Sequence, residues 1–206
     1  MKSTLYLKFI LLYIILGFLS IFTVASLSST LTTYYLESSI SGNMYQSANL
    51  LASTYLPDYF SETITLADVY TQLNGMSDYL NSDIWFVDNE GSLLASAKSG
   101  DISYAVFCLK NFDPAESGSD RSQTGDYHGY FDNDVITVTV PVTYGYFPKG
   151  YLMIHQYTTV VDTMTDILMR GVYITFIVIF LLSFIILLAF HFLVYRPLHK
   201  ITEAAT

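Results

Sequence analysis

The sequence predicts an α+β fold, in which one antiparallel sheet flanked by helices lies between two transmembrane α-helices. Three observations support this. Two long apolar blocks lie near the ends of the 206-residue chain. Helical hydrophobic spacing follows the first block and precedes the second, and the spacing between them changes to the alternation of strands. The region between the blocks also holds 17 of the 18 acidic residues but only 5 of the 9 basic ones.

The two apolar blocks are residues 9–29 and 171–195, and neither contains an acidic residue, a lysine or an arginine. As helices, both are long enough to cross the ~30 Å of hydrocarbon in a bilayer. Soluble core helices rarely sustain such runs, because one of their faces meets water. A cleaved signal peptide, with the small residues Val24–Ser26 near the cleavage site, is the alternative interpretation of the first block.

The charge distribution predicts the orientation in the membrane. Residues 36–170 carry a net charge of −12, whereas four basic residues flank the apolar blocks on their other sides: Lys2, Lys8, Arg196 and Lys200. Lysine and arginine close to the ends of a span stay in the cytoplasm. We therefore expect residues 1–8 and 196–206 to be cytoplasmic and residues 30–170 to form an extracytoplasmic domain.

Two helices are expected at the start of this domain. Apolar residues recur at intervals of three or four over Leu36–Tyr55, so the first helix continues out of the membrane, and Pro57 ends it. The same spacing over Thr65–Leu80 predicts a second helix.

The next residues have the composition of strands. The runs Ile84–Val87 and Leu93–Ala95 flank the turn sequence Asp88–Gly91, which predicts a β-hairpin. A further strand is expected at Tyr104–Leu109, with Cys108 buried in it.

The rest of the sheet is expected after a polar loop at Asn111–Tyr127. Asp134–Val142 is β-branched on both faces, which predicts a strand in the middle of a sheet, with Pro141 at its end. After a turn at Tyr144–Gly150, the last strand is Tyr151–Gln156. Helical spacing returns at Thr159 and continues into the second apolar block.

The order of these elements resembles the PAS-like Cache sensor domains of bacterial membrane receptors. Three stretches carry the resemblance: the helix Leu36–Tyr55, the strand and turn Ile84–Gly91, and the closing run Val138–Gln156. The strand and turn are similar to the pattern (I/V)-x-(I/V)-x-D-x-x-G of that family. The resemblance implies an extracytoplasmic domain that senses a small ligand, a cation or a partner protein, in the plasma membrane of a bacterial cell.

The final residues, 196–206, resemble the start of a HAMP linker, which begins with a proline just inside the membrane. Pro197 is suited to a first helical turn, and Leu198 and Ile201 lie at the spacing of a bundle seam. A sensor domain followed by such a linker implies the input half of a two-component histidine kinase. Chemotaxis receptors and cyclic-dinucleotide enzymes have similar input halves. The alternative interpretation of residues 196–206 is a generic basic flank that stops the translocation of the second membrane span.

The chain contains no catalytic motif, so we predict no catalytic residue and no cofactor in it. Phosphate loops, zinc-protease motifs and nucleophile elbows are absent from the sequence. ATP, magnesium and a response regulator would belong to a kinase region beyond Thr206. An acidic exterior argues against nucleic acid as a partner.

The candidate ligand-binding residues lie on the sheet and on the loop before its middle strand: Trp85, Arg121, His128, Tyr130 and Asp132. Arg121 could hold a carboxylate through two hydrogen bonds, although pairing with a neighbouring aspartate is the simpler interpretation. Trp85 could stack on a ligand or belong to the core. The acidic residues around this loop lack the spacing of a calcium site, so no metal site is predicted.

Signal transmission is assigned to helical residues on both sides of the second apolar block: Val160, Met164, Ile167, Gly171, Pro197, Leu198 and Ile201. We expect a homodimer in which two copies pair through Leu36–Tyr55 and the membrane helices. Ligand binding would displace the closing helix. A membrane-anchored binding protein without signalling is the alternative.

Overall fold

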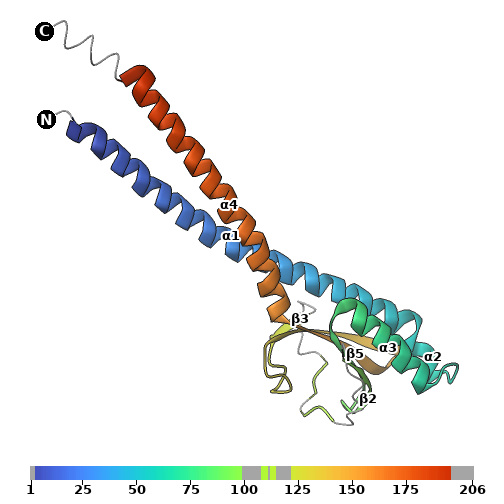
Figure 1. The fold of residues 1–206 in the computed structure, drawn as a ribbon. Helices are drawn as coiled ribbons and strands as arrows, with labels where there is room; N and C mark the ends of the chain where they lie inside the picture. Colours follow the sequence, from blue (N-terminus) through green and yellow to red (C-terminus); the bar gives the residue numbers. More distant parts are fainter. Residues whose placement is uncertain (1–2, 99–107, 111, 115–121, 196–206) are drawn as a thin grey trace, which may run out of the picture. The chain divides into compact units, whose positions relative to one another are not determined.

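The computed structural model describes residues 3–98, 108–110, 112–114 and 122–195 (Figure 1). The chain divides into two compact units, Thr33–Thr163 and the two ends, Met1–Thr32 with Met164–Thr206. The elements in chain order are α1 (Ser3–Thr54), α2 (Leu56–Phe60), α3 (Leu66–Leu80), β1 (Asp83–Asp88), β2 (Leu93–Ala97), β3 (Ser122–Gly125), β4 (Val135–Tyr144), β5 (Phe147–Tyr157), α4 (Thr158–Phe190) and the π-helix η2 (His191–Tyr195).

The described strands of the first unit form one antiparallel sheet in the order β2-β1-β5-β4-β3. The predicted hairpin is present as β1 and β2. Its turn is held by the Asp88 carboxylate, which accepts hydrogen bonds from the backbone N–H groups of Glu90 and Ser92 at 2.9 and 2.8 Å. Gly91 has φ +82°, a conformation that glycine adopts without strain. The predicted α+β class with one antiparallel sheet is therefore confirmed.

The helices cover one face of this sheet, as Figure 1 shows for α3 and the neighbouring part of α1. The apolar row predicted on the first helix faces the sheet, where Met44, Ala48 and Leu51 are buried. Val69 and Leu73 of α3 join the same core. The long helix ends at Thr54, before Pro57, as predicted. The apolar face of α1 is therefore buried against the sheet of its own chain.

Two expectations about the strands are wrong. The segment Asn111–Tyr127 contains the strand β3, which is polar and short and so gave no hydrophobic signal. β4 continues through Pro141 to Tyr144. β3 pairs only with Val135–Val138, so one edge of β4 beyond Val138 makes no ladder with the described residues, and proline is tolerated on such an edge.

The predicted turn at Tyr144–Gly150 is also shorter than expected. β4 and β5 pair as far as Tyr144 and Phe147, so the turn consists of Gly145 and Tyr146 alone. Both residues have positive φ, +61° and +69°, as in type I′ turns, whose twist matches that of the strands. Tyr146 is fully exposed at this tip.

Cys108 is exposed, so its expected place in a buried strand is wrong. It forms an isolated bridge with Ser92, and its sulfur lies 3.8 Å from the carbonyl oxygen of Glu90. Leu109, the next residue, is buried instead and donates its backbone N–H to the Gly91 carbonyl at 2.9 Å. Residues 104–107 of the predicted strand lie outside the described residues.

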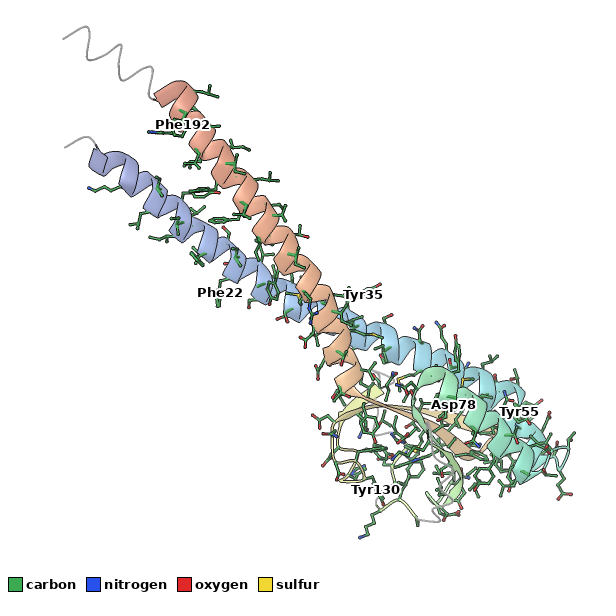
Figure 2. All side chains as sticks on the ribbon, in the orientation of Figure 1. Phe22, Tyr35, Tyr55, Asp78, Tyr130 and Phe192 are labelled. Carbon is green, nitrogen blue, oxygen red and sulfur yellow. The ribbon has the colours of Figure 1, made fainter. Side chains whose placement is uncertain are left out.

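The second unit consists of the apolar parts of α1 and α4. The most apolar windows of these helices have mean hydropathies of 2.5 and 3.0, and neither window is buried. Figure 2 labels Phe22 on α1 and Phe192 on η2, which follows α4. The hydroxyls of Ser20 and Thr23 donate to carbonyls four residues earlier, at 2.8 and 2.9 Å. Polar groups satisfied within a helix are compatible with a bilayer.

Candidate functional site

The sheet has a second buried face, on the side away from α3. Successive residues of a strand point to opposite faces, so Trp85 and Met153 lie on this side while Phe86 and Ile154 face the helices. Residues 126–134, which connect β3 to β4, form a covering segment. Its Tyr127 and Phe131 pack on the second face of the sheet. Figure 2 shows Tyr130 of this segment on the opposite side of the sheet from Asp78 of α3.

An aromatic cluster of Trp85, Tyr127, Phe131 and His155 lies at the centre of this face. The centroid of the His155 ring is 4.2 Å from that of Trp85 and 5.0 Å from those of Tyr127 and Phe131. Phe131 stacks on Trp85 at a centroid distance of 5.2 Å. Such contacts stabilise a cluster beyond the area that they bury.

His155 is completely buried in this cluster and is neutral. Its Nδ1 shares a hydrogen bond of 2.8 Å with the hydroxyl of Thr137, which lies opposite it on β4. Its Nε2 has no hydrogen-bond partner among the residues that the structure describes. Burial lowers the pKa of His155 to about 3 from the ordinary 6.5, because the protonated ring would lose its hydration.

The covering segment has an unusual backbone. Tyr127, His128 and Gly129 all have positive φ, of 45°, 59° and 78°. Two consecutive non-glycine residues in this region cost on the order of 1–3 kcal/mol each. The conformation is held by the hydrogen bond from the Phe131 N–H to the Asp126 carbonyl, at 3.2 Å, and it places Tyr127 and Phe131 on the sheet.

A pocket of about 340 Å³ opens beside the aromatic cluster. β1, the end of β2, the covering segment and the end of β5 contribute its lining: Asp83, Trp85, Ser96, Ala97, Lys98, Tyr130, Phe131, Asp132, Asn133 and Tyr157. Two further cavities, of about 470 and 460 Å³, lie beside α1. We take the first as the candidate ligand site, because it combines charged groups, hydroxyls and aromatic walls on three strands and a strained segment.

The pocket contains two carboxylates and one amine. Asp83, at 7% exposure, begins β1, whereas Asp132 and Lys98 are exposed at the rim. Burial raises the pKa of the Tyr157 hydroxyl; the charge of Asp83 raises it further, that of Lys98 opposes the rise, and that of Asp132 adds to it. The charges of Asp83, Lys98 and Asp132 therefore all act on the Tyr157 hydroxyl in the pocket wall.

The structure brings together three of the five predicted ligand residues, Trp85, Tyr130 and Asp132. Trp85 is also a core residue, since only 9% of it is exposed. His128 is exposed and contacts Tyr127 edge-on, at 5.1 Å between centroids, outside the pocket lining. Arg121 lies outside the described residues.

Sequence reasoning gave no site role to Asp83, His155 and Tyr157. All three lie on one face of neighbouring strands, because Asp83 pairs with His155, and Tyr157 follows two residues later. Alternation along the last strand would have placed Tyr151, Met153 and His155 on one face. The strand order was also needed to bring Asp83 beside them.

The described acidic residues near the covering segment do not gather into a metal site. Within the ranges that the structure describes, no group of three or more His, Cys, Asp or Glu side chains could hold a metal ion.

The predicted signalling residues of α4 have different surroundings. Val160 is partly exposed, whereas its neighbour Val161 is buried in the core beneath the helices. Met164 and Ile167 are 44% and 63% exposed. A side-chain carbon added at Gly171 would meet no atom within 4 Å. Pro197, Leu198 and Ile201 lie outside the described residues.

No protein-family model matches the sequence, and no curated protein matches it. Solved structures do match. The "extracellular domain of the putative histidine kinase vpHK1S-Z8" superposes with a TM-score of 0.52 at 14% identity, over 68% of this chain and 59% of that one. A "domain of putative sensory box/GGDEF family protein from Vibrio parahaemolyticus" gives 0.50 at 13% identity, over 66% and 61%.

This chain thus spans about six tenths of each of these structures. At such low identity the likeness concerns the fold alone. It agrees with the element order derived from the sequence, in which a long helix precedes a hairpin and a closing pair of strands leads into a second long helix. The chain shares the fold of these two domains, one five-stranded antiparallel sheet flanked by helices, and it also carries two long apolar helices.

Proposed function

We propose that this chain is the signal-receiving part of a bacterial membrane receptor. Two apolar helices and a sensor-type fold support a membrane protein whose sheet domain lies outside the cell. In this proposal residues 9–29 and 171–195 cross the plasma membrane. Residues 1–8 and 196–206 are then cytoplasmic, in agreement with the charge distribution.

The observation that best supports this proposal is that the pocket lining is joined directly to a long helix. Tyr157 lines the pocket, and Thr158, the next residue, begins α4. The N–H and the hydroxyl of Thr158 both donate to the carbonyl of Asp134, at 3.0 and 3.1 Å, which fixes the start of the helix to the start of β4. From there α4 continues without interruption to Phe190.

A ligand in the pocket would bias the position of this helix. Asp132 and Asn133 in the wall directly precede Asp134, so a ligand contacts both segments that fix Thr158. If the domain has two packings, the ligand shifts their balance by its differential affinity for them. The helix then slides, tilts or rotates, and its continuation transmits the displacement through the membrane to a HAMP linker that includes Pro197, Leu198 and Ile201.

We further propose that the receptor is a homodimer. Because the apolar face of α1 packs on its own sheet, pairing through this helix requires the opposite face, which carries Tyr35, Ser39, Gly42 and Gln46. No charged residue occurs between Ser38 and Pro57, so a second α1 could approach without burying a charge. Met164 and Ile167 are exposed and are available for the same purpose on α4.

The leading candidate for the output is a histidine kinase, which would bind ATP and magnesium and act on a response regulator. The hypothesis rests on the HAMP-like residues 196–206, which lie outside the described residues. A chemotaxis receptor or a cyclic-dinucleotide enzyme would use the same input half. Reading the gene beyond Thr206 separates these outputs, because each has a different following domain.

The test is a change of helical phase between the domain and the membrane. We would fuse the chain to a kinase reporter and insert one alanine after Arg170, which rotates the following helix by about 100°. We expect the reporter output to change strongly. A seven-residue insertion at the same place, which nearly restores the phase, is the matched control and should retain more of the normal output. Equal output from all three proteins would contradict the proposal.

A further inference from the structure

Building on the proposed function, we propose that the pocket beside the aromatic cluster binds a small organic cation, with an ammonium group held between Asp83 and Asp132. The sensing function itself would survive if the ligand belonged to another class. The argument rests on the charges of the lining, on the chemistry of its other groups and on the charge of the whole domain.

The charges in the pocket favour a cation. Asp83 and Asp132 outnumber Lys98, and Asp83 is almost completely buried, where charges interact more strongly than in water. Burial raises the pKa of the Tyr157 hydroxyl; the charge of Asp83 raises it further, that of Lys98 lowers it, and that of Asp132 raises it, so all three charges act on this hydroxyl. Lys98 is exposed at the rim, so solvent screens its charge more than that of Asp83.

The remaining groups suit an organic ion better than a metal ion. A divalent metal needs several oxygen ligands around one point, and no cluster of three or more ligand side chains occurs among the described residues. The pocket offers instead the hydroxyl of Ser96, the amide of Asn133 and the partly exposed rings of Tyr130 and Tyr157. Hydroxyl and amide oxygens accept N–H bonds, and the rings contact alkyl carbons.

The whole domain attracts the same class of ligand. Residues 36–170 carry a net charge of −12, so the potential around the pocket is negative on average. Cations are therefore concentrated near the domain, and anions approach it against repulsion. The carboxylates of the pocket and the net charge of the whole domain therefore both favour a cation.

Trp85 provides a direct measurement, because it is the sole tryptophan of the chain and lines the pocket. We would titrate the full chain in detergent micelles with three probes of similar size, propylammonium, propanol and propionate, at constant ionic strength. Tryptophan fluorescence is the readout. We expect a saturable change with propylammonium, and no saturation with the other two over the same range.

Three variants test the charges. Asp132→Asn should weaken propylammonium binding about fivefold, and Lys98→Gln should strengthen it about twofold, since each removes one partly screened charge. Asp78→Asn, on α3 at the other face of the sheet, is the matched control and should leave the affinity unchanged (Figure 2). All three positions are exposed, so the variants should fold, and their thermal unfolding midpoints check this.

Saturation by propylammonium with these opposite effects of the two rim variants would support the proposal. Binding of propionate that Lys98→Gln weakens would overturn the cation class while leaving a ligand-binding sensor. Saturation by none of the probes would also overturn the proposal. The insertion test after Arg170 measures reporter output rather than ligand binding. Failure of the proposed signalling function can therefore be distinguished from failure of the proposed ligand class.

Discussion

His155 combines three properties that rarely occur together in one residue. It is completely buried, three aromatic rings surround it, and its Nε2 has no hydrogen-bond partner within the described part of the chain. A buried unsatisfied nitrogen costs about 1–3 kcal/mol, and a buried charge would cost more. Protonation of this histidine should therefore destabilise the second face of the sheet.

Acid should therefore weaken the domain. The pKa of His155 is about 3 in the folded chain and about 6.5 when unfolded, so the unfolded chain binds the extra proton between these values. The contribution to stability is fully present above pH 6.5 and falls by about 1.4 kcal/mol per unit as the pH drops toward 3. Thermal unfolding in micelles at pH 7, 6, 5 and 4, followed through Trp85 fluorescence, should show the loss.

The double variant His155→Phe with Thr137→Val removes the titrating ring and its hydrogen-bond partner together. It should flatten the acid slope between pH 6.5 and 4. His128→Gln, a change of an exposed histidine in the covering segment, should keep the slope of the parent chain. A parent and double variant with the same slope would show that His155 does not govern acid sensitivity.

At the scale of elements, α3 is defined by its first turn. The Thr65 hydroxyl accepts the N–H of Asp68 at 3.3 Å, and the Asp68 carboxylate accepts the N–H of Thr65 at 2.8 Å, which is a reciprocal capping box. These hydrogen bonds lower the pKa of the Asp68 carboxyl. At the other end, Asn81 adopts the left-handed conformation that commonly closes a helix.

Thr65→Ala should destabilise the sheet domain by about 1 kcal/mol, because it removes the hydroxyl that accepts the Asp68 N–H and donates to the Asp68 carboxylate. Thr71→Ala is the matched control. Its hydroxyl bonds only to the carbonyl of Ala67 within the same helix, so its loss should cost little. The thermal unfolding midpoints of the two variants measure the difference. A larger loss for Thr71→Ala would contradict the role of the capping box.

Elements with a strong local signal were predictable from the sequence. The hairpin of β1 and β2 follows from β-branched and aromatic runs around an Asp-Asn-Glu-Gly turn, and α3 follows from its 3–4 spacing. β3 could not be predicted in this way, because Ser122–Gly125 pairs through its backbone at an edge and has no apolar alternation. The local rule for Pro141 failed because, among the described residues, β3 pairs with β4 only as far as Val138.

The site was predictable only in part, for a related reason. Trp85, Tyr130 and Asp132 were identified by residue type close to the expected sheet face. Asp83 and His155 are neighbours only because β1 pairs with β5, although 71 residues of chain lie between them. Burial, rather than sequence context, makes His155 unusual, and burial depends on the covering segment.

At the scale of the whole molecule, the acidic domain and the basic flanks of the apolar helices imply a defined orientation. Cys108 is the sole cysteine of the chain and is exposed on the sheet domain. A membrane-impermeant maleimide added to spheroplasts should therefore modify the parent chain without permeabilisation. Labelling is measured as a mass shift of the purified protein.

The control moves the cysteine to the other side of the membrane. In a Cys108→Ser background, Thr4→Cys should react only after the membrane is permeabilised, because residues 1–8 are expected in the cytoplasm. Labelling of Cys108 that requires permeabilisation would contradict an external domain.

The alternation along β1 and β5 has a consequence for divergence between related proteins. Trp85 and Met153 belong to the pocket side of the sheet, and their immediate neighbours Phe86 and Ile154 belong to the helix side. If the pocket receives a ligand as proposed, substitutions at every second position would change that ligand, while the positions between them keep α1 and α3 packed. Ligand specificity and architecture would then be encoded by alternate residues of the same strands.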